Sequence, residues 1–215
     1  MEYKLKIVCF LDILAFKNII NNTLDKDQND KTEKIKEIHD VLHLAREILD
    51  IGKEDEMAKS KMVTQFSDSI VISFDIQEQS QIFFTLNELM HLIMNFAYRG
   101  ILVRGGISYG KLIHTKEIVF GPGLISAYET ESRAALYPRV ILDKSIIDIA
   151  KLFPFHAGHA EHEEEAILNI VTKDTDDMYY IDYIKKAQSE LDDPQRGMPN
   201  YINHLIKIAE NNKDF

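Results

Sequence analysis

The order of strand-like and helix-like segments constrains the fold of this chain more than any other feature. Residues 5–11 form a short apolar run that ends abruptly at Asp12, which predicts a strand buried on both faces. Apolar residues then recur with helical spacing over residues 13–20, so Asp12 is predicted at a strand-to-helix junction. The segments that follow are a loop at 21–31, a helix from Thr32 to Gly52, a hairpin at 62–74 with Asp68 at its tip, a helix at 79–98 and a strand at 101–108.

These segments give the order strand, helix, strand, strand, helix, strand, which is the βαββαβ order of a ferredoxin-like sheet. Further segments are a helix at 122–135, a strand at 139–142, a helix at 145–152, a strand at 178–184 and a C-terminal helix from about Tyr201. A chain of 215 residues is long enough for one core but hardly for two. We therefore predict one α+β domain over 1–215, with its core at about 4–143 and a C-terminal extension at about 144–215.

The composition of the chain limits the kinds of ligand that this domain can bind and the location in which it works. Thirty-five acidic and 25 basic side chains leave a formal charge of −10, which repels nucleic-acid backbones but still allows a small polyphosphate neutralised by a bound cation. The one cysteine, Cys9, lies in an apolar run, which favours a buried thiol and a cytoplasmic location. Neither a targeting segment nor a membrane span is predicted, because long apolar windows do not occur in the sequence.

Asp12 and Asp68 are the two candidate metal ligands. Each is predicted at a strand end, where two carboxylates can share hard divalent cations and leave open positions for phosphate oxygens. Such a site suits phosphoryl or nucleotidyl transfer. The alternative is that both aspartates have structural roles only, in turns or as helix caps. The main-chain amides at the start of the first helix are predicted to form a phosphate-binding site beside Asp12; they belong to Ile13, Leu14, Ala15 and Phe16.

Four segments resemble motifs of the class III adenylyl and guanylyl cyclases. Residues 10–16 are similar to the family's Phe-x-Asp-Ile-x-Gly-Phe opening, and residues 66–70 resemble its second metal motif. Residues 103–110 are similar to its Arg-x-Gly-Ile-x-x-Gly strand, and residues 121–132 resemble its Gly-x-x-x-Asn-x-Ala-x-Arg-x-Glu helix. The four motifs occur in the family's order, and the resemblance covers about residues 4–143.

This resemblance implies a two-metal enzyme. Two Mg²⁺ or Mn²⁺ ions would be held by Asp12, Ile13 and Asp68, and a nucleoside triphosphate would be converted into a 3′,5′-cyclic nucleotide and pyrophosphate. The family's active sites lie between two subunits, so a homodimer is implied as well.

The sequence departs from the family at the positions that bind ribose, base and phosphate. Ile125 stands in place of the ribose-binding Asn, Glu129 in place of the transition-state Arg, and Thr64 in place of the purine-reading Lys. In size and layout the chain resembles the Pycsar cyclases, which make cyclic CMP or cyclic UMP in anti-phage signalling. We therefore expect UTP or CTP as substrate. The alternatives are a degenerate domain that binds a nucleotide or a protein partner as a sensor, and another metal-dependent phosphotransferase or hydrolase.

A triphosphate needs positive charge, and three arginines are candidates to supply it. Arg133 lies one helical turn beyond Glu129, while Arg104 lies on the predicted strand at 101–108 and Arg139 on the one at 139–142. Each of them could instead form a structural ion pair with a nearby acid. Gly105, Gly106 and Gly110 permit close approach of a nucleotide or of a neighbouring helix, and packing is the simpler interpretation.

Three histidines, at 156, 159 and 162, have a spacing that can bind zinc. Pro154, Gly158 and the following acidic run favour a solvated loop instead. The acidic segment at 173–177 lacks the length and the closing Glu of an EF-hand, so it is predicted to be a turn before a strand.

Overall fold

The computed structural model describes residues 2–49, 60–135, 137–156, 158–191 and 193–211. In chain order its elements are β1 (Lys4–Ile13), α1 (Phe16–Asn21), α2 (Thr32–Ile48), β2 (Met62–Phe66), β3 (Ser69–Asp75), α3 (Gln81–Tyr98), β4 (Val103–His114), β5 (Val119–Phe120), α4 (Pro122–Ala134), β6 (Val140–Leu142), α5 (Lys144–Ala150), α6 (Ala160–Leu168), β7 (Val171–Lys173), β8 (Tyr179–Ile181), a 3₁₀ helix η1 (Lys186–Glu190) and α7 (Pro194–Asn211). Within these residues, no helix combines the length and the apolar character that crossing a membrane requires.

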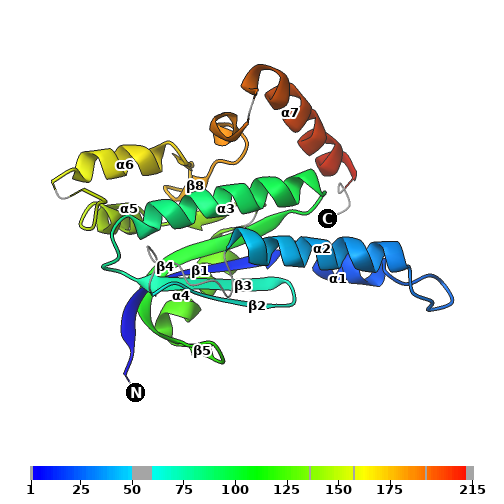
Figure 1. Cartoon of the computed structure of the whole chain (residues 1–215), viewed down its shortest axis with the longest axis horizontal. Coiled ribbons are helices and arrows are strands. Elements are labelled where there is room, and N and C mark those ends of the chain that lie inside the picture. The colour runs from blue at the N-terminus through cyan, green and yellow to red at the C-terminus, as the bar shows by residue number, and fades with distance from the viewer. Residues whose placement is uncertain (1, 50–59, 136, 157, 192, 212–215) are drawn as a thin grey trace.

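The strands form one mixed sheet, ordered β2-β3-β1-β4-β6-β8-β7, with β5 paired to β4 beside it (Figure 1). Each of the first four strands in this order is antiparallel to its neighbours among them, and β1 lies between β3 and β4. Together with the helices between them, they confirm the predicted ferredoxin-like βαββαβ arrangement. The extra C-terminal strands continue the sheet beyond β4: β6 runs parallel to β4, and β8 and β7 follow antiparallel.

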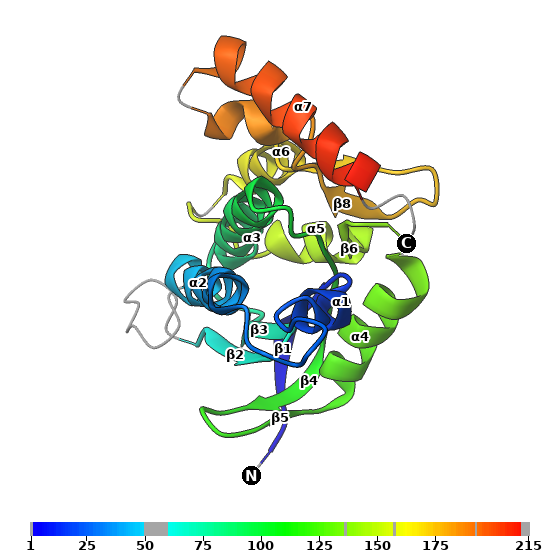
Figure 2. The ribbon, with the colours of Figure 1, turned by 90° about the vertical axis from the view of Figure 1, so that its right-hand side faces the viewer.

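The two faces of the sheet are covered differently. Alternate residues of β1, from Ile7 to Ile13, join the main core with β3, α2 and α3. The opposite face of β1 is covered by α4, where Val8 and Ala127 belong to a smaller apolar cluster. Figure 2 shows α2 and α3 on one side of β1 and β4 and shows α4 on the other. The sheet is therefore buried on both faces around β1, as the continuous apolar run predicted.

Packing explains the glycines of β4. A Cβ atom on Gly106 would lie 2.4 Å from the carbonyl oxygen of Ala127 in α4, and one on Gly110 would lie 2.8 Å from the Cα atom of Gly123. The two glycines therefore let α4 approach the sheet closely, which agrees with the packing interpretation.

The structure corrects the prediction around the three histidines. A helix, α6, begins at Ala160 and includes the whole acidic run at 161–165 that was predicted to be a solvated loop. Glu161 and Glu163 lie in its first turn, where carboxylates interact favourably with the helix dipole. Two strands that were not predicted, β5 and β7, are only two and three residues long. The last helix begins at Pro194 rather than near Tyr201.

Candidate functional site

Asp12 and Asp68 lie at the same end of the sheet. Asp12 is near the end of β1, in register with Ser69 of β3 and with Arg104 of β4. Asp68 occupies the two-residue turn between β2 and β3, where Ser67 has a positive φ of 56°. The N–H of Ile13 donates to the carbonyl oxygen of Asp68 at 3.1 Å, which ties the hairpin turn to the end of β1. The abrupt end of one apolar run and the polar centre of the hairpin thus place two carboxylates side by side.

Arg104 and Glu131 complete this group of side chains. The Arg104 guanidinium forms an ion pair with Glu131 of α4, and its Nε lies 3.7 Å from a carboxylate oxygen of Asp12. Glu131 is only 1% exposed. The sequence left Arg104 as either a phosphate-binding or an ion-pairing residue, and the structure pairs it with Glu131. Glu131 itself was missed as a site residue, although it occupies the final Glu of the helix motif.

The acids of this group repel one another. Burial raises the pKa of Asp12, the charge of Asp68 raises it further, and Arg104 lowers it. Burial also raises the pKa of Glu131, with Arg104 opposing and Asp12 reinforcing the shift. Raised carboxyl pKa values favour the protonated forms in the folded chain, so these acids stabilise the fold most at low pH, and this contribution is lost as pH rises through their folded pKa values. A bound divalent cation would relieve the repulsion.

The shifted pKa of Asp12 predicts how Mn²⁺ binding depends on pH. Metal ligands must be deprotonated, so Mn²⁺ affinity should fall on acidification with a midpoint above the ordinary aspartate range. Because Arg104 lowers the pKa of Asp12, the substitution Arg104→Met should move this midpoint to higher pH. Arg133→Met is the matched control, since Arg133 is exposed and pairs with Glu129. Titration of bound Mn²⁺ by electron paramagnetic resonance measures all three midpoints, and an unshifted Arg104→Met midpoint would contradict the assignment.

The residues present fit a hard divalent cation. Asp12 and Asp68 supply the carboxylate oxygens that Mg²⁺ and Mn²⁺ prefer. Within the described part of the chain, no three Asp, Glu, His or Cys side chains are arranged to hold a metal ion by themselves. Water or substrate phosphate would therefore have to supply further ligands, as is usual for Mg²⁺. Ile13 stays a prediction as a third ligand; because an isoleucine side chain has no atom that can bind a cation, its main-chain carbonyl oxygen would be the donor.

Fewer main-chain amides can serve the predicted phosphate-binding site than the sequence suggested. The amide of Ile13 donates to Asp68, and the amide of Leu14 donates to the carbonyl oxygen of Leu102 at 2.9 Å. These two N–H groups already have acceptors, so the prediction that they bind phosphate is corrected. The amides of Ala15 and Phe16, at the start of α1, stay as predicted phosphate donors.

Arg133 does not face Asp12 in its own chain. It lies on the exposed side of α4, where its guanidinium donates to Glu129 at 3.1 Å, whereas Glu131 points inward. Ile125 shares the exposed side of the helix and is 61% exposed. Arg139, the third candidate, is buried and binds Asp174 and Asp176 at 2.5 and 2.6 Å, so it holds the segment before β8 rather than a substrate.

Thr64 belongs to a hydrogen-bonded group that the sequence did not reveal. Its hydroxyl lies 2.9 Å from Nε2 of His114, and the hydroxyl of Ser73 lies 2.8 Å from Nδ1. Burial and the charge of Lys6 lower the pKa of His114 to about 4, so the imidazole is neutral near pH 7. One ring nitrogen then donates and the other accepts. The signal was hidden because β4 was expected to end at residue 108, six residues before His114.

The three histidines lie together around the start of α6. The rings of His159 and His162 stack with centroids 5.0 Å apart, and those of His156 and His159 are 6.2 Å apart. They line a small cavity of about 100 Å³ together with Glu163, whose carboxylate accepts from the hydroxyl of Ser80. They do not form one of the arrangements that could hold a metal ion among the described residues.

Comparisons with known proteins find solved structures that are similar to this chain, but no matching family model or curated protein. A bacterial light-regulated adenylyl cyclase is similar at 15% identity and a TM-score of 0.48, over 68% of this chain and 79% of that chain. The catalytic core of a rhodopsin-guanylyl cyclase with converted specificity, in complex with ATPαS, is similar at 17% identity and a TM-score of 0.48, over 69% and 82%. The monomeric guanylyl cyclase domain of a RhoGC fusion protein from the aquatic fungus Blastocladiella emersonii gives 12% and 0.48, over 84% and 96%. The fold assignment rests on the strand order and register described above.

Proposed function

We propose that this chain is a nucleotidyl cyclase that converts a nucleoside triphosphate into a 3′,5′-cyclic nucleotide and pyrophosphate. The observation that carries the proposal is the meeting of Asp12 and Asp68 at one end of the sheet, with the Ile13 amide bonded to Asp68 and Arg104 within 3.7 Å of Asp12. Both aspartates lie in segments that resemble the metal motifs of class III cyclases. Acidic repulsion at this place is costly without a cation and is expected in a metal-binding site.

In the proposed reaction, the ribose 3′-oxygen bonds to the α-phosphorus while the bond from that phosphorus to the pyrophosphate oxygen breaks. The proton of the hydroxyl group is lost to solvent. Asp12 and Asp68 would hold two Mg²⁺ or Mn²⁺ ions, which lower the pKa of the attacking hydroxyl and neutralise the leaving pyrophosphate. Arg104 opposes the upward shift in the pKa of Asp12 and so favours its ionised form, and the ion pair with Glu131 would position Arg104. The amides of Ala15 and Phe16 would donate to the phosphates.

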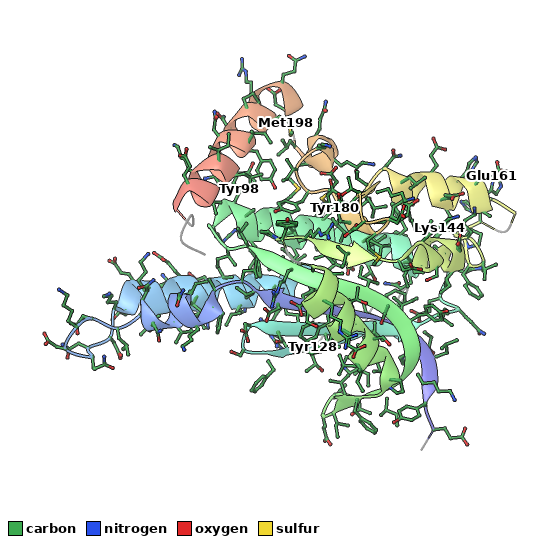
Figure 3. All side chains as sticks on the ribbon, turned by 180° about the vertical axis from the view of Figure 1, so that it is seen from behind. Tyr98, Tyr128, Lys144, Glu161, Tyr180 and Met198 are labelled. Atoms are coloured by element: carbon green, nitrogen blue, oxygen red, sulfur yellow. The ribbon has the colours of Figure 1, made fainter. Side chains whose placement is uncertain are left out.

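We further propose a homodimer in which α4 of one subunit faces the site of the other. Ile125 and Tyr128 leave 61% and 53% of their surfaces exposed on α4. Tyr128, labelled in Figure 3, packs edge to face against Phe10 of β1. This apolar surface lies on the Asp12 face of the sheet, because Phe10 and Asp12 are two residues apart in β1. Arg133 would then reach the triphosphate of the partner rather than its own.

A pyrimidine base is the proposed preference. Thr64 replaces the purine-reading Lys of the family, and His114 fixes the Thr64 hydroxyl at 2.9 Å. The neutral pair of Thr64 hydroxyl and His114 imidazole offers a hydrogen-bond donor or acceptor that carries no charge, unlike a lysine. Such a pair suits a base whose edge differs from that of a purine. A role in anti-phage signalling, in the cytoplasm, is supported by the resemblance to Pycsar cyclases.

The second candidate function is a sensor that binds a nucleotide or a protein partner without turnover. The specific observation in its favour is the exposed side of α4, which carries apolar Ile125 and acidic Glu129 where a cyclase needs ribose-binding and cationic groups. Glu129 also partly neutralises Arg133.

Product analysis separates the two functions. Pure protein is incubated with ATP, GTP, CTP or UTP in Mn²⁺, and the products are resolved by mass, with Asp68→Asn as the control for contaminating activity. We expect a cyclic mononucleotide from UTP or CTP that is absent with the variant. Four unchanged triphosphates, together with Mn²⁺-dependent nucleotide binding, would favour the sensor. Free phosphate or a linear nucleotide would favour a hydrolase or phosphotransferase.

A further inference from the structure

A cavity of about 930 Å³ is lined by residues of α1, α2, the C-terminal end of α3 and α7, and neither Asp12 nor Asp68 is among its lining. Figure 1 shows how these helices are arranged. We call this cavity the α2/α3/α7 cavity. Its lining includes the end of α3 at Tyr98 and Arg99, residues of α7 at His204 and Lys207, and five residues of α2: Lys34, Glu37, Ile38, Asp40 and Val41. None of the four residues of the candidate cyclase site is among its lining. A volume of this size is typical of sites for small-molecule ligands.

The lining of this cavity is basic in a chain that is acidic overall. Four cationic side chains, those of Lys31, Lys34, Arg99 and Lys207, face two acidic ones, Glu37 and Asp40, whereas the whole chain has a formal charge of −10. Lys34 pairs with Glu37 at 2.7 Å. Basic groups that gather in a concave site favour a small anion even where the net charge of the protein is negative.

Two of the remaining cations, Arg99 and Lys31, donate to neutral main-chain carbonyl groups, and Lys31 also interacts electrostatically with the carboxylate of Asp25. The Arg99 guanidinium donates to the carbonyl oxygen of Asn95 at 3.0 Å, and the Lys31 ammonium donates to that of Asn22 at 3.3 Å. Each of these bonds uses one donor of a group that has several, so the charges remain available to an anionic ligand. Arg99 is well suited to phosphate because its fork can donate two parallel hydrogen bonds.

The walls of the cavity also offer a flat aromatic surface. The ring of Tyr98, labelled in Figure 3, stacks with that of His204, with centroids 5.8 Å apart and planes inclined by 27°. Nε2 of His204 lies 3.1 Å from the carbonyl oxygen of Ala97, so this nitrogen carries the proton and fixes the imidazole against the end of α3. Tyr98 remains 45% exposed. Ile38, Val41 and Ile101 supply apolar lining, which suits the ring of a ligand rather than its charged part.

We propose that the α2/α3/α7 cavity binds a nucleoside phosphate independently of divalent metal. Its phosphate lies against Arg99, Lys31 and Lys207, and its base lies against Tyr98 and His204. The chemistry differs from that of the Asp12 site, where acidic groups need a cation before they accept a phosphate. This inference does not depend on the proposed cyclase function, because it uses none of the same residues.

Calorimetric titration in the presence of EDTA tests the proposal, because removal of divalent cations silences any metal-dependent site. The four nucleoside 5′-monophosphates are the probes, and the corresponding nucleosides and ribose 5-phosphate are the comparison ligands. We expect at least one monophosphate to bind, more tightly than its nucleoside and more tightly than ribose 5-phosphate. Asp12→Asn should bind it equally well. Absence of binding for all four at millimolar concentration would overturn the proposal.

Substitutions in the lining test whether the nucleoside phosphate binds in the α2/α3/α7 cavity. The double variant Arg99→Gln, Lys207→Gln should weaken binding by at least about tenfold, since a hydrogen bond between charged groups contributes on that scale. Both side chains are exposed, so the variant should fold, and its melting temperature verifies this. Lys36→Gln is the matched control: Lys36 is an exposed lysine of α2 outside the cavity lining. Equal binding by the double variant and the control would place the ligand elsewhere and overturn the proposal.

Discussion

Replacing Asp12 by Asn is expected to abolish Mn²⁺-dependent product formation while the chain stays folded and becomes no less stable. If Asp12 holds the catalytic cation as proposed, its loss should lower turnover by at least about 10³-fold, because metal ions contribute several kcal/mol to such reactions. The stability expectation follows from the pKa of Asp12, which burial and Asp68 raise. Near pH 7 the folded chain must hold this carboxylate ionised against both effects, and Asn removes the charge.

The experiment combines two measurements on one preparation. Cyclic product is quantified by mass, and the melting temperature is measured with and without Mn²⁺. Asp148→Asn is the matched control, because Asp148 is an exposed aspartate of α5. Without metal, Asp12→Asn should melt at or slightly above the temperature of the parent; with Mn²⁺, the parent should gain stability and the variant should not. An unfolded variant would show that Asp12 is structural, and a fully active one would remove it from the reaction.

The positions of Asp12 and Asp68 were predictable because each depends on local patterns. A continuous apolar run that stops at an acid marks the end of a buried strand, and a polar pair between two β-rich halves marks a hairpin turn. Their meeting then follows from the βαββαβ order. The same reasoning predicted the helix that carries Glu131, but not which of its acids would pair with Arg104.

Other features depend on contacts between segments distant in sequence. The choice of Glu131 over Glu129 is set by the rotation of α4 about its axis, and that rotation depends on how the helix rests on β4. The pairing of Thr64 with His114 joins residues 50 positions apart and needs β4 to extend past its predicted end. The helix α6 was missed because an acidic run looks solvated in sequence, although Glu163 is buried against Ser80.

Gly106→Ala should have the largest effect on stability among the substitutions near the site. Its Cβ atom would lie 2.4 Å from the carbonyl oxygen of Ala127 and 2.7 Å from the amide nitrogen of Glu131, both main-chain atoms of α4. Main-chain atoms of a helix cannot move singly, so α4 must shift as a unit and Glu131 must shift with it. Overpacking of this kind costs about 1–3 kcal/mol, and each kcal/mol lowers the melting temperature by roughly 2–4 °C in a chain of this size.

The shift of α4 should also reach the proposed metal site, which distinguishes this variant from a general loss of stability. Displacing Glu131 disturbs its ion pair with Arg104, and Arg104 is the group that lowers the pKa of Asp12. Gly106→Ala should therefore bind Mn²⁺ more weakly than the parent at temperatures where both are folded. Gly197→Ala is the control, since Gly197 lies in α7 and the three atoms nearest to an added Cβ would all belong to the side chain of Leu191, at 3.2 Å or more. If Gly106→Ala kept the parent's melting temperature and Mn²⁺ affinity, the contact between β4 and α4 would not be what positions Glu131 and, through it, Arg104.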